Sequence, residues 1–513
     1  MSNIKKLAGQ TMWYGVSSIA ARFLYYLLTP YLTAKLSVER YGDMSIIYSA
    51  IPFLNVVFTY GIETAYFRFA TKDKNKKSIY NTAIISILCS TVFFTAILIF
   101  SRSYFAHLLK LDKYPEYVAL FTIIIAVDTI CTIPFAKLRL DQRPRKYASI
   151  KISSIILQII SVYFFLSVCP RMAITNPNGF IAIFYNPTFG VGYIIIANLI
   201  ASCFSLILLQ KELFAFKFQF DKVIWKSMIL YSLPLLIVGF GGVINETFDR
   251  IMLPWLANVA TESAAKDQVA IYSACYKLSI LITLFVQAFR MGAEPFFFKQ
   301  AEGQNPQKVY ARVMKFFVIT ITTMFLLVVL YLDIWKYFLS SNKEKLAIYW
   351  TGLKVVPILL LANMFLGIYY NLSIWYKLTH KTIAGAYITL IGAGITLVIN
   401  YIFIPHFGYM ACAWATFLCY FSMMVISFIW GQKDYRIPYA WRKLCAYIVI
   451  VVLIYFVHRA FVHYFTSLFA NFFSATILLC LYILFVLKVE WREVRGLPVI
   501  GKYFQSSGFM KRK

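Results

Sequence analysis

The sequence is short of charge, and it is especially short of acidic residues. Charged residues make up only 14% of the 513 residues, against about 25% in an average soluble domain. Hydrophobic residues make up 61% and aromatic residues 18%. We find no stretch longer than about 25 residues that lacks strong apolar character. The chain therefore has no room for a soluble domain, and most of it must be solvated by lipid.

Basic residues outnumber acidic ones, with 50 Lys and Arg against 21 Asp and Glu, for a net charge of +29. The basic residues lie in short clusters between apolar runs and form no basic face interleaved with stacking aromatics, which excludes a nucleic-acid partner. The clusters either only fix the topology or also bind anionic membrane lipids. The largest are Lys72, Lys74, Lys76 and Lys77; Arg139, Arg143, Arg145 and Lys146; and Lys511, Arg512 and Lys513.

Residues that build metal sites and active sites are few and scattered. The nine cysteines show no CxxC or Cys/His spacing, and the five histidines are isolated. We interpret the cysteines as small packing residues and expect no metal or cofactor. Membrane enzymes that act on lipid-linked sugars need carboxylates or histidines on a large external loop. The longest external loop that we expect, 169–187, is rich in Asn, Pro and Gly instead, so we do not expect an enzyme.

Apolar runs of about 20 residues, the length that a helix needs to cross the hydrocarbon core, recur along the whole chain. We therefore predict an all-α polytopic membrane protein with about fourteen spans. The spans are expected near Thr11–Ala34, Met44–Phe67, Ile79–Phe100, Tyr117–Ala136, Tyr147–Val168, Thr188–Leu209, Ser227–Asp249, Val269–Phe289, Val309–Leu332, Tyr349–Trp375, Thr382–Ile404, Tyr409–Trp430, Leu444–Val462 and Thr466–Leu487.

The loops between these spans alternate in their content of Lys and Arg. Most basic residues fall in the N-terminal segment, in every second loop and in the C-terminal tail. Because such residues stay in the cytoplasm, both termini are predicted to be cytoplasmic. We expect no cleavable signal peptide, because the first apolar run is long enough to span the membrane and lacks a small-residue cleavage site.

A short motif suggests an internal repeat. Ile47–Ala50 recurs as Ile271–Ala274, early in the second predicted span of each half of the chain. Six spans per copy make the repeats parallel, and such a pair encloses a cleft between two lobes. We therefore predict an N-lobe at 1–215, a C-lobe at 216–435, two further helices at 436–490 and a basic cytoplasmic tail at 491–513.

Ionisable residues inside the spans are the strongest functional signal, because each costs about 2.5 to 3.5 kcal/mol at the centre of a membrane helix. Arg22 and Lys277 have no acidic residue at helical spacing on their own span. We therefore predict that they line a water-filled cleft and bind substrate, with Arg250 as a third candidate. The alternative is that the charges only pair with one another as structural ion pairs.

Acidic and helix-end residues form a second group of candidates, for lining the cavity or coupling transport to an ion. Asp128, Glu246 and Asp249 lie within or at the end of predicted spans, and three more residues lie near predicted cytoplasmic helix ends. The full group is Glu63, Asp128, Glu246, Asp249, Arg290 and Glu294.

Several of these residues belong to segments that resemble a known family. The segments are Tyr41–Gly42, Gly61–Arg68, Leu233–Pro234 leading to Asp249–Arg250, Ile271–Ala274 with Tyr276–Lys277, and Ala293–Phe296. With these segments, the whole chain resembles the polysaccharide flippases of the multidrug/oligosaccharidyl-lipid/polysaccharide exporter superfamily.

The resemblance implies that a polyprenyl diphosphate-linked oligosaccharide is moved across the bacterial cytoplasmic membrane, by alternating access of two six-helix lobes. It leaves open whether a polysaccharide polymerase is a partner, and whether an ion gradient or the membrane potential drives transport. A drug or cation antiporter of the same superfamily is the nearest rival function, although its cavity should be acidic. Two more functions stay open: a membrane-embedded enzyme acting on lipid-linked sugars, and a scaffold for neighbouring membrane proteins.

Overall fold

The fold is entirely helical in the residues that the computed structural model describes, which are 19–494 apart from 21, 73, 74, 302 and 466. Thirteen helical segments among them are long and apolar enough to cross a membrane. Each overlaps one predicted span, whereas the predicted first span, Thr11–Ala34, lies partly outside the described residues. The predicted fold class, an all-α polytopic membrane protein, is confirmed. The helices form two compact units, one from Met1–Lys299 with Phe338–Gly431 and one from Gln300–Tyr337 with Gln432–Lys513.

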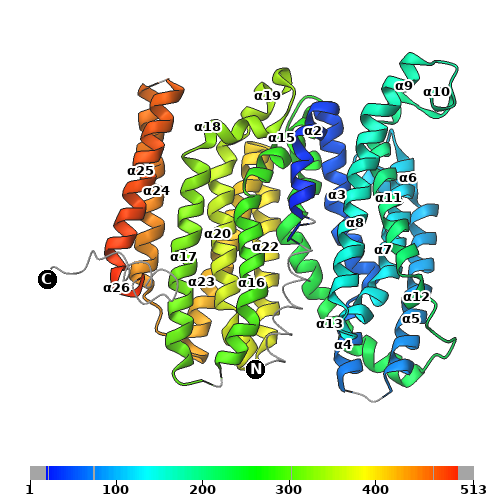
Figure 1. The fold of residues 1–513 in the computed structure, drawn as a ribbon, viewed down its shortest axis with the longest axis horizontal. Coiled ribbons are helices and arrows are strands. Elements are labelled where there is room, and N and C mark those ends of the chain that lie inside the picture. Colours follow the sequence, from blue (N-terminus) through cyan, green and yellow to red (C-terminus); the bar gives the residue numbers. More distant parts are fainter. Residues whose placement is uncertain (1–18, 21, 73–74, 302, 466, 495–513) are drawn as a thin grey trace. The chain divides into compact units, whose positions relative to one another are not determined.

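The first half of the larger unit is a bundle of long helices that run alongside one another (Figure 1). Its spans α3, α5, α7, α8 and α11 are joined by short helices. The bounds are α2 (Thr29–Lys35), α3 (Val38–Thr59), α4 (Ile62–Lys72), α5 (Lys76–Phe100), α6 (Arg102–Leu108), α7 (Pro115–Leu140), α8 (Pro144–Tyr163), η1 (Phe164–Val168), α9 (Cys169–Thr175), α10 (Phe180–Phe184), η2 (Pro187–Phe189), α11 (Val191–Leu208) and α12 (Gln210–Leu213).

The second half of this unit has the same construction. Its spans are α13, α16, α20, α22 and α23, and α15 continues into α16. The bounds are α13 (Lys222–Thr247), α14 (Asp249–Leu256), α15 (Glu262–Leu278), α16 (Ile280–Gln300), α19 (Lys343–Trp350), η4 (Leu353–Val355), α20 (Val356–Leu372), α21 (Ile374–Leu378), α22 (Thr382–Phe407) and α23 (Tyr409–Asp434).

Local sequence explains where several of these helices begin. The side chains of Ser37, Asp221 and Thr261 accept hydrogen bonds from backbone N–H groups in the first turns of α3, α13 and α15. These N-terminal groups lack partners inside the helix, so a capping oxygen stabilises the helix start. Pro115 and Pro144 begin α7 and α8, where a missing N–H costs nothing.

Several predicted spans are broken where a single helix was expected, and the second and the eighth are two of them. The second span ends as α3 at Thr59, because Tyr60 and Gly61 adopt positive φ angles of 34° and 76° before α4 begins. A left-handed pair of residues cannot continue a right-handed helix, and glycine adopts that conformation without strain. The eighth span is interrupted at Ser279, where α15 ends and α16 begins, and it continues to Gln300.

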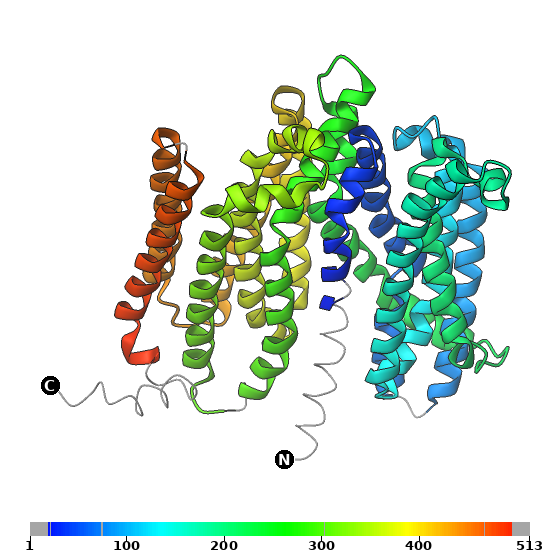
Figure 2. The ribbon, with the colours of Figure 1, turned by 45° about the horizontal axis from the view of Figure 1, so that its top comes forward.

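The loop expected at 169–187 is largely helical. It contains α9 and α10 and ends in the short 3-10 helix η2. Figures 1 and 2 show α9 and α10 protruding beyond one end of the first bundle. The expected loop therefore consists of short helices, which the Asn and Pro residues in it separate from one another.

The two halves of this unit meet along α3 and α15, the helices that carry the repeated motif. Gly42 allows the closest approach, since a Cβ atom there would lie 2.2 Å from the backbone oxygen of Lys266. Ile47 and Tyr272, one from each copy of the motif, are fully buried. Equivalent helices are expected to face each other in this way around a pseudo-twofold axis, although the predicted lobe boundaries stay a prediction.

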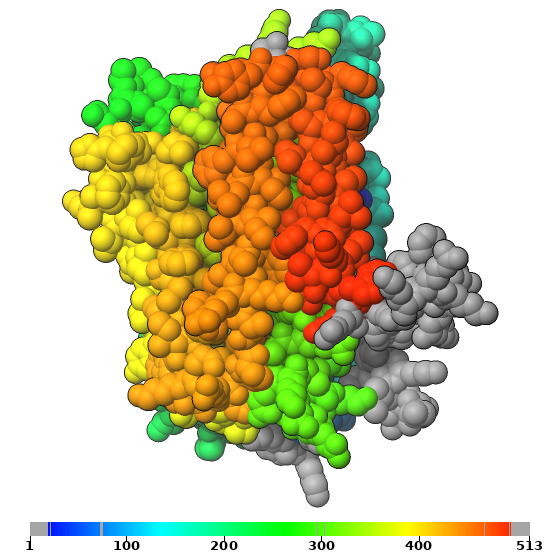
Figure 3. Space-filling model, turned by 90° about the vertical axis from the view of Figure 1, so that its left-hand side faces the viewer, coloured from blue at the N-terminus to red at the C-terminus, as the bar shows by residue number. Residues whose placement is uncertain are grey.

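The smaller unit consists of three long helices that pack on one another, together with short helices. Its helices are α17 (Pro306–Val329), α18 (Leu332–Trp335), η3 (Lys336–Leu339), α24 (Trp441–Tyr464), α25 (Leu468–Val489) and α26 (Trp491–Val494). Figure 3 shows α24 and α25, in orange and red, side by side along their length. Both helices expose large apolar side chains such as Leu453, Phe456, Phe469 and Leu481, as expected of helices that face lipid.

A buried carboxylate joins the helices of this smaller unit. Glu490, at the end of α25, is only 3% exposed. It binds the Nζ atoms of Lys315 and Lys443 at 3.0 and 2.5 Å and accepts a hydrogen bond of 2.6 Å from the Tyr447 hydroxyl. Burial alone would raise the pKa of Glu490, but hydrogen bonds from Lys443, Tyr447 and Lys315 outweigh it and hold the pKa below its usual range.

We predict that Glu490→Gln lowers the free energy of unfolding at neutral pH by about 1.5 to 3 kcal/mol, because hydrogen bonds to a charged partner are lost. The lowered pKa means that Glu490 stabilises the fold above the pKa of an unfolded glutamate, about 4.3, and that this contribution disappears as pH falls further. Thermal unfolding in detergent should therefore separate wild type from variant at pH 7 and bring them together under acid. The control is Glu116→Gln, at an exposed residue. A gap that stays constant with pH would contradict the prediction.

Candidate functional site

A cavity of 490 Å³ opens in the larger unit between α2 and α3 on one side and α13, α14, α15 and α16 on the other. We call it the cationic cavity. Its lining residues are Arg22, Tyr25, Tyr26, Thr29, Leu32, Tyr41, Met44, Ser45, Tyr48, Ser49, Ile155, Gln158, Glu246, Thr247, Arg250, Ser273, Tyr276, Lys277, Ile280, Thr283 and Leu284. All three residues predicted to bind substrate, Arg22, Lys277 and Arg250, are among them.

Arg22 and Lys277 line this cavity and form no ion pair with a described carboxylate. Arg22 lies in the helical segment 22–27 before α2 and is exposed, and Lys277 lies one residue before the end of α15 and is half-buried. Neither forms an ion pair with any carboxylate among the described residues, within a limit of 4.0 Å. The Lys277 ammonium group lies 5.9 Å from the centre of the Tyr25 ring. Their positive charges are therefore available to an anion in the cavity.

Arg250 is held differently from the other two cations. Its Nη1 atom lies 3.3 Å from Oδ1 of Asp249 and donates a 3.0 Å hydrogen bond to the backbone oxygen of Glu246. Its guanidinium lies over the rings of Tyr276 and Tyr272, at 4.5 and 5.3 Å from their centres. Tyr272 in turn donates a 2.6 Å hydrogen bond to Oδ2 of Asp249. Asp249 therefore compensates Arg250, which is a fixed and largely neutralised part of the wall.

Hydroxyl groups in the same wall lack hydrogen-bond partners. Those of Tyr26, Ser273 and Thr283 are buried, and none has a partner among the described residues. A buried hydroxyl without a partner is costly. A ligand with several acceptor oxygens would satisfy these donors.

Glu246 is the acidic residue among the described lining residues of this cavity. It is exposed to the cavity, and its carboxylate forms no ion pair with a described residue. Glu246, Tyr276 and Thr283 also line a second and larger cavity, so the two compartments adjoin. Glu246 therefore stands at the junction of the two compartments.

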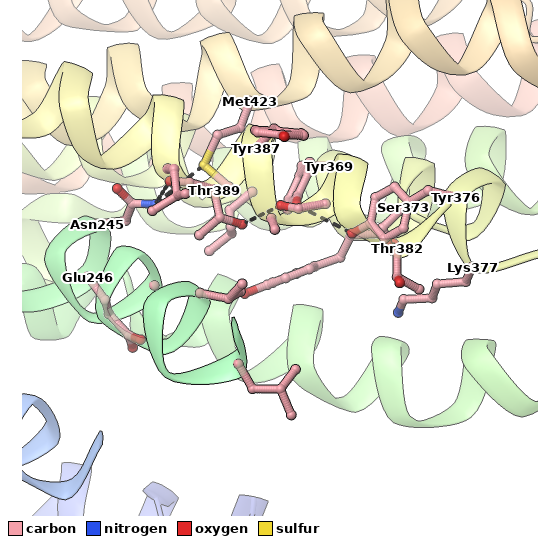
Figure 4. A pocket seen from close by; sticks show the side chains of 18 of the residues that line it. Asn245, Glu246, Tyr369, Ser373, Tyr376, Lys377, Thr382, Tyr387, Thr389 and Met423 are labelled. Atoms are coloured by element: carbon pink, nitrogen blue, oxygen red, sulfur yellow. Dashed lines mark hydrogen bonds between the residues drawn. The ribbon is translucent and has the colours of Figure 1, made fainter. Parts of the chain in front are cut away.

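The second cavity, of 940 Å³, is surrounded mainly by α13, α16, α20, α21, α22 and α23. We call it the tyrosine cavity, because seven tyrosines line it: Tyr231, Tyr276, Tyr369, Tyr370, Tyr376, Tyr387 and Tyr420. Figure 4 shows Glu246 and Lys377 at opposite ends of it, with Tyr369 and Tyr376 between them. Its other polar residues include Asn245, whose amide group donates a 3.1 Å hydrogen bond to the backbone oxygen of Thr389.

The remaining candidates from the sequence are distributed over other places. Glu63 pairs with Arg139, and Glu294 pairs with Lys377. Asp128 of α7 lines neither cavity, and its carboxylate interacts electrostatically with Lys151 of α8. Arg290 lines the tyrosine cavity and lies over the ring of Tyr370, 4.8 Å from its centre. The structure thus brings Arg22, Lys277, Arg250, Glu246 and Asp249 together, and it places Glu63, Asp128 and Glu294 elsewhere.

A buried ion pair closes the contact between α3 and α15. Lys266 lies 3.0 Å from Asp43 and 3.1 Å from Glu262, and both Lys266 and Asp43 are almost fully buried. From this pair, α3 runs on to the cavity residues Ser45 and Ser49 as α15 runs on to Ser273 and Lys277. The Asp43–Lys266 pair therefore holds α3 against α15 next to the cationic cavity, although neither residue is among its lining residues.

Neither Asp43 nor Lys266 was predicted as a functional residue, because both precede the start of the expected spans. The tyrosines were missed as well. Their signal was the high tyrosine content, 37 residues, with Tyr369 and Tyr370 on one expected span and Tyr376 directly after it. Among the described residues, no group of three His, Cys, Asp or Glu side chains is placed to hold a metal ion.

Helices that cross the membrane around a cationic cavity define a polytopic membrane transporter. Residues 7–301, more than half of the chain, match the family described as "Polysaccharide biosynthesis protein", and residues 252–402 match the family described as MatE. The chain belongs to the polysaccharide biosynthesis protein family, within the multidrug/oligosaccharidyl-lipid/polysaccharide exporter superfamily, as the resemblance predicted. No curated protein matches the chain significantly.

Solved structures share this fold at low sequence identity. The inward closed conformation of the lipid II flippase MurJ matches with a TM-score of 0.71 at 15% identity, covering 94% of this chain and 99% of that one. An inward-facing multidrug resistance MATE family transporter matches with a TM-score of 0.62 at 14% identity, covering 85% and 95%. A superfamily transporter from Pyrococcus furiosus, whose title reports reversed polarity of its binding pocket, matches with a TM-score of 0.56 at 14% identity, covering 86% and 96%.

We predict that Asp43→Asn destabilises the protein by about 3 to 5 kcal/mol, because it leaves the buried Lys266 ammonium paired only with Glu262. The double variant Asp43→Asn with Lys266→Met should recover part of the loss, since it also removes the unpaired charge. Unfolding in detergent, measured for both single variants and the double variant, gives the coupling energy. Additive losses would show that the pair is not coupled.

Proposed function

We propose that this protein is a flippase that translocates a polyprenyl diphosphate-linked oligosaccharide across the bacterial cytoplasmic membrane for surface polysaccharide biosynthesis. The observation that carries the proposal is the cationic cavity, where Arg22 and Lys277 face one space and form no ion pair with a described carboxylate. Alternating access of the lobes at 1–215 and 216–435 would expose this space to each side of the membrane in turn.

The charges and donors of the cavity suit a diphosphate. A diphosphate that bridges a lipid and a sugar carries roughly two negative charges and several acceptor oxygens, and charge-assisted hydrogen bonds to phosphate are among the strong ones. Arg22 and Lys277 would supply the two charges, and the buried hydroxyls of Tyr26 and Ser273 would supply further donors. Attraction between opposite charges is strong where helices exclude water.

The membrane potential would assist outward movement of such a headgroup. Each charge that moves through 100 mV changes the free energy by about 2.3 kcal/mol, so two negative charges gain about 4 to 5 kcal/mol in an inside-negative membrane. The potential alone could therefore drive flipping, and antiport of an ion is an equal alternative. Glu246, unpaired among the described residues at the junction of the cavities, is the residue that would carry an ion if transport is coupled.

A drug or cation antiporter of the same superfamily is the second candidate function, favoured by the match of residues 252–402 to MatE. Its cavity should attract a cation, yet Arg22, Arg250 and Lys277 face the single carboxylate of Glu246 among the described lining residues. A membrane-embedded enzyme receives less support, because residues 169–187 contain no Asp, Glu or His. The charge of the cavity favours the flippase.

The proposed function also implies how the chain is oriented in the membrane and which partners it has. Both termini would lie in the cytoplasm, by the distribution of Lys and Arg between the loops. The membrane-facing partners are the lipid-linked substrate and membrane lipids. A polysaccharide polymerase that receives the flipped substrate on the outer surface is the protein partner that the proposed reaction calls for.

We predict that purified protein in liposomes flips a fluorescent polyprenyl diphosphate saccharide and does not export a cationic dye. Arg22→Ala and Lys277→Ala should each slow flipping about tenfold or more, because each removes one charge-assisted contact with the diphosphate. Arg22→Lys and Lys277→Arg should retain much of the rate. The matched control is Arg102→Ala, at an exposed arginine on α6 that lines neither cavity.

Two outcomes would overturn the proposal. Dye efflux without saccharide flipping would assign the protein to the drug exporters and would make Glu246 the main candidate for the binding residue. Saccharide flipping at full rate in the Arg22→Ala, Lys277→Ala double variant would remove the assigned role of the cationic cavity.

A further inference from the structure

We infer that the tyrosine cavity binds the saccharide of the substrate and that this saccharide is acidic, carrying a carboxylate such as that of a uronic acid. The inference rests on the proposed flippase function and deepens it. Its basis is a second pair of cations, Arg68 and Arg290, which form no ion pair with a described carboxylate and line a compartment that adjoins the diphosphate site.

Arg68 and Arg290 approach this cavity from different helices, α4 and α16. Both side chains are exposed to it, and neither forms an ion pair with a carboxylate among the described residues. Each guanidinium lies over a tyrosine ring, Arg68 4.2 Å from the centre of Tyr231 and Arg290 4.8 Å from the centre of Tyr370. Stacking holds the planar group in place and leaves its N–H edge free for a planar, bidentate partner such as a carboxylate.

A third cation that lines the tyrosine cavity, Lys377, is neutralised by a carboxylate of the protein itself. Lys377 pairs with Glu294, so its charge needs no ligand. The unpaired carboxylate of Glu246 can balance only one of the charges of Arg68 and Arg290, so the described side chains leave an excess of positive charge in this cavity. The diphosphate does not balance it either, because Arg22 and Lys277 in the cationic cavity already match its two charges.

The remaining surface of the cavity suits a sugar. Tyrosine offers an apolar ring face for the C–H side of a pyranose and a hydroxyl for its polar edge. Asn371 adds an unused amide group nearby: it is 2% exposed, and both its side-chain oxygen and nitrogen lack partners among the described residues. Asn371 lines a small pocket that shares Arg290, Tyr370 and Lys377 with the tyrosine cavity.

The positions of the charged side chains along the tyrosine cavity also predict how the saccharide is oriented in it. Glu246 at the junction would repel a carboxylate on the sugar nearest the diphosphate. Figure 4 places Glu246 at one end of the cavity and Lys377 at the other, and Arg290 shares the small pocket with Lys377. The carboxylate is therefore assigned to a sugar distant from the diphosphate, next to Arg290.

An anionic lipid headgroup is the other source of negative charge that two arginines could bind. Binding of a headgroup and binding of a sugar carboxylate would depend on different components of the experiment. A headgroup would depend on the composition of the bilayer and not on the saccharide, whereas a sugar carboxylate would depend on the saccharide in a bilayer of any composition.

The test uses two synthetic polyprenyl diphosphate trisaccharides that differ only at the terminal sugar, a uronic acid in one and its carboxyl-reduced, neutral form in the other. Flipping by the full chain is measured in neutral phosphatidylcholine liposomes. We expect the acidic substrate to be flipped about tenfold more efficiently at low concentration, because it gains charge-assisted hydrogen bonds. Arg68→Gln with Arg290→Gln should abolish the preference, so that the two substrates are flipped at equal rates.

Two further variants test whether the preference depends on the charge and on the position of these arginines. Arg68→Lys with Arg290→Lys should keep part of the preference, since a lysine ammonium supplies the charge without the bidentate geometry. Arg102→Gln should keep all of it. Each variant is checked for its thermal unfolding midpoint, so that a folding defect is not mistaken for a loss of preference.

The outcomes separate this inference from the function on which it rests. Equal flipping of both trisaccharides by wild type would overturn the acidic saccharide and leave the flippase standing. No flipping of either would overturn the flippase itself. If the Arg68 and Arg290 variants change flipping only when phosphatidylglycerol replaces phosphatidylcholine, and equally for both substrates, the arginines bind headgroups and the inference is wrong.

Discussion

A cation inside the membrane is stable only where something compensates its charge, and the arrangement of this protein follows from that constraint. Lys266 is compensated by Asp43 where α3 meets α15, and Arg250 is compensated by Asp249 in the wall of the cavity. These two pairs need no ligand. Arg22 and Lys277 lack such partners among the described residues and share one cavity. The distribution of acidic residues, more than that of basic ones, thus distinguishes structural cations from those available to substrate.

Much of the fold could be predicted from the sequence, because a membrane span is a local property. Length and apolar character alone identify a helix that can cross the hydrocarbon core. The interruptions at Tyr60–Gly61 and at Ser279 were not predictable in the same way. A glycine or a serine inside a membrane helix is common and does not by itself indicate a break. Their effect depends on contacts with other helices, which a window of sequence does not contain.

The candidate site was predictable to the extent that burial of charge is costly. Arg22, Lys277, Arg250 and Glu246 were selected for that reason, and the structure gathers them around one cavity; that they act on substrate stays a prediction. The same criterion also selected residues near helix ends, such as Glu63 and Glu294, where pairing with Arg139 and Lys377 was not visible in the sequence. The tyrosines gave no comparable signal, because tyrosine is tolerated both in the core and at membrane interfaces.

The interruption at Ser279 separates α15, which is fixed against α3, from α16, which lines both cavities. On one side, α15 is clamped against α3 by the close approach of Gly42 and by the Asp43–Lys266 pair. On the other, α16 carries Thr283 and Arg290 along both cavities. Lys277 lies two residues before the interruption, so an anion that binds it acts on the joint itself. If that anion binds one angle between α15 and α16 more tightly than another, its affinity difference sets the population of the two angles, and substrate becomes the regulator of the movement that carries it.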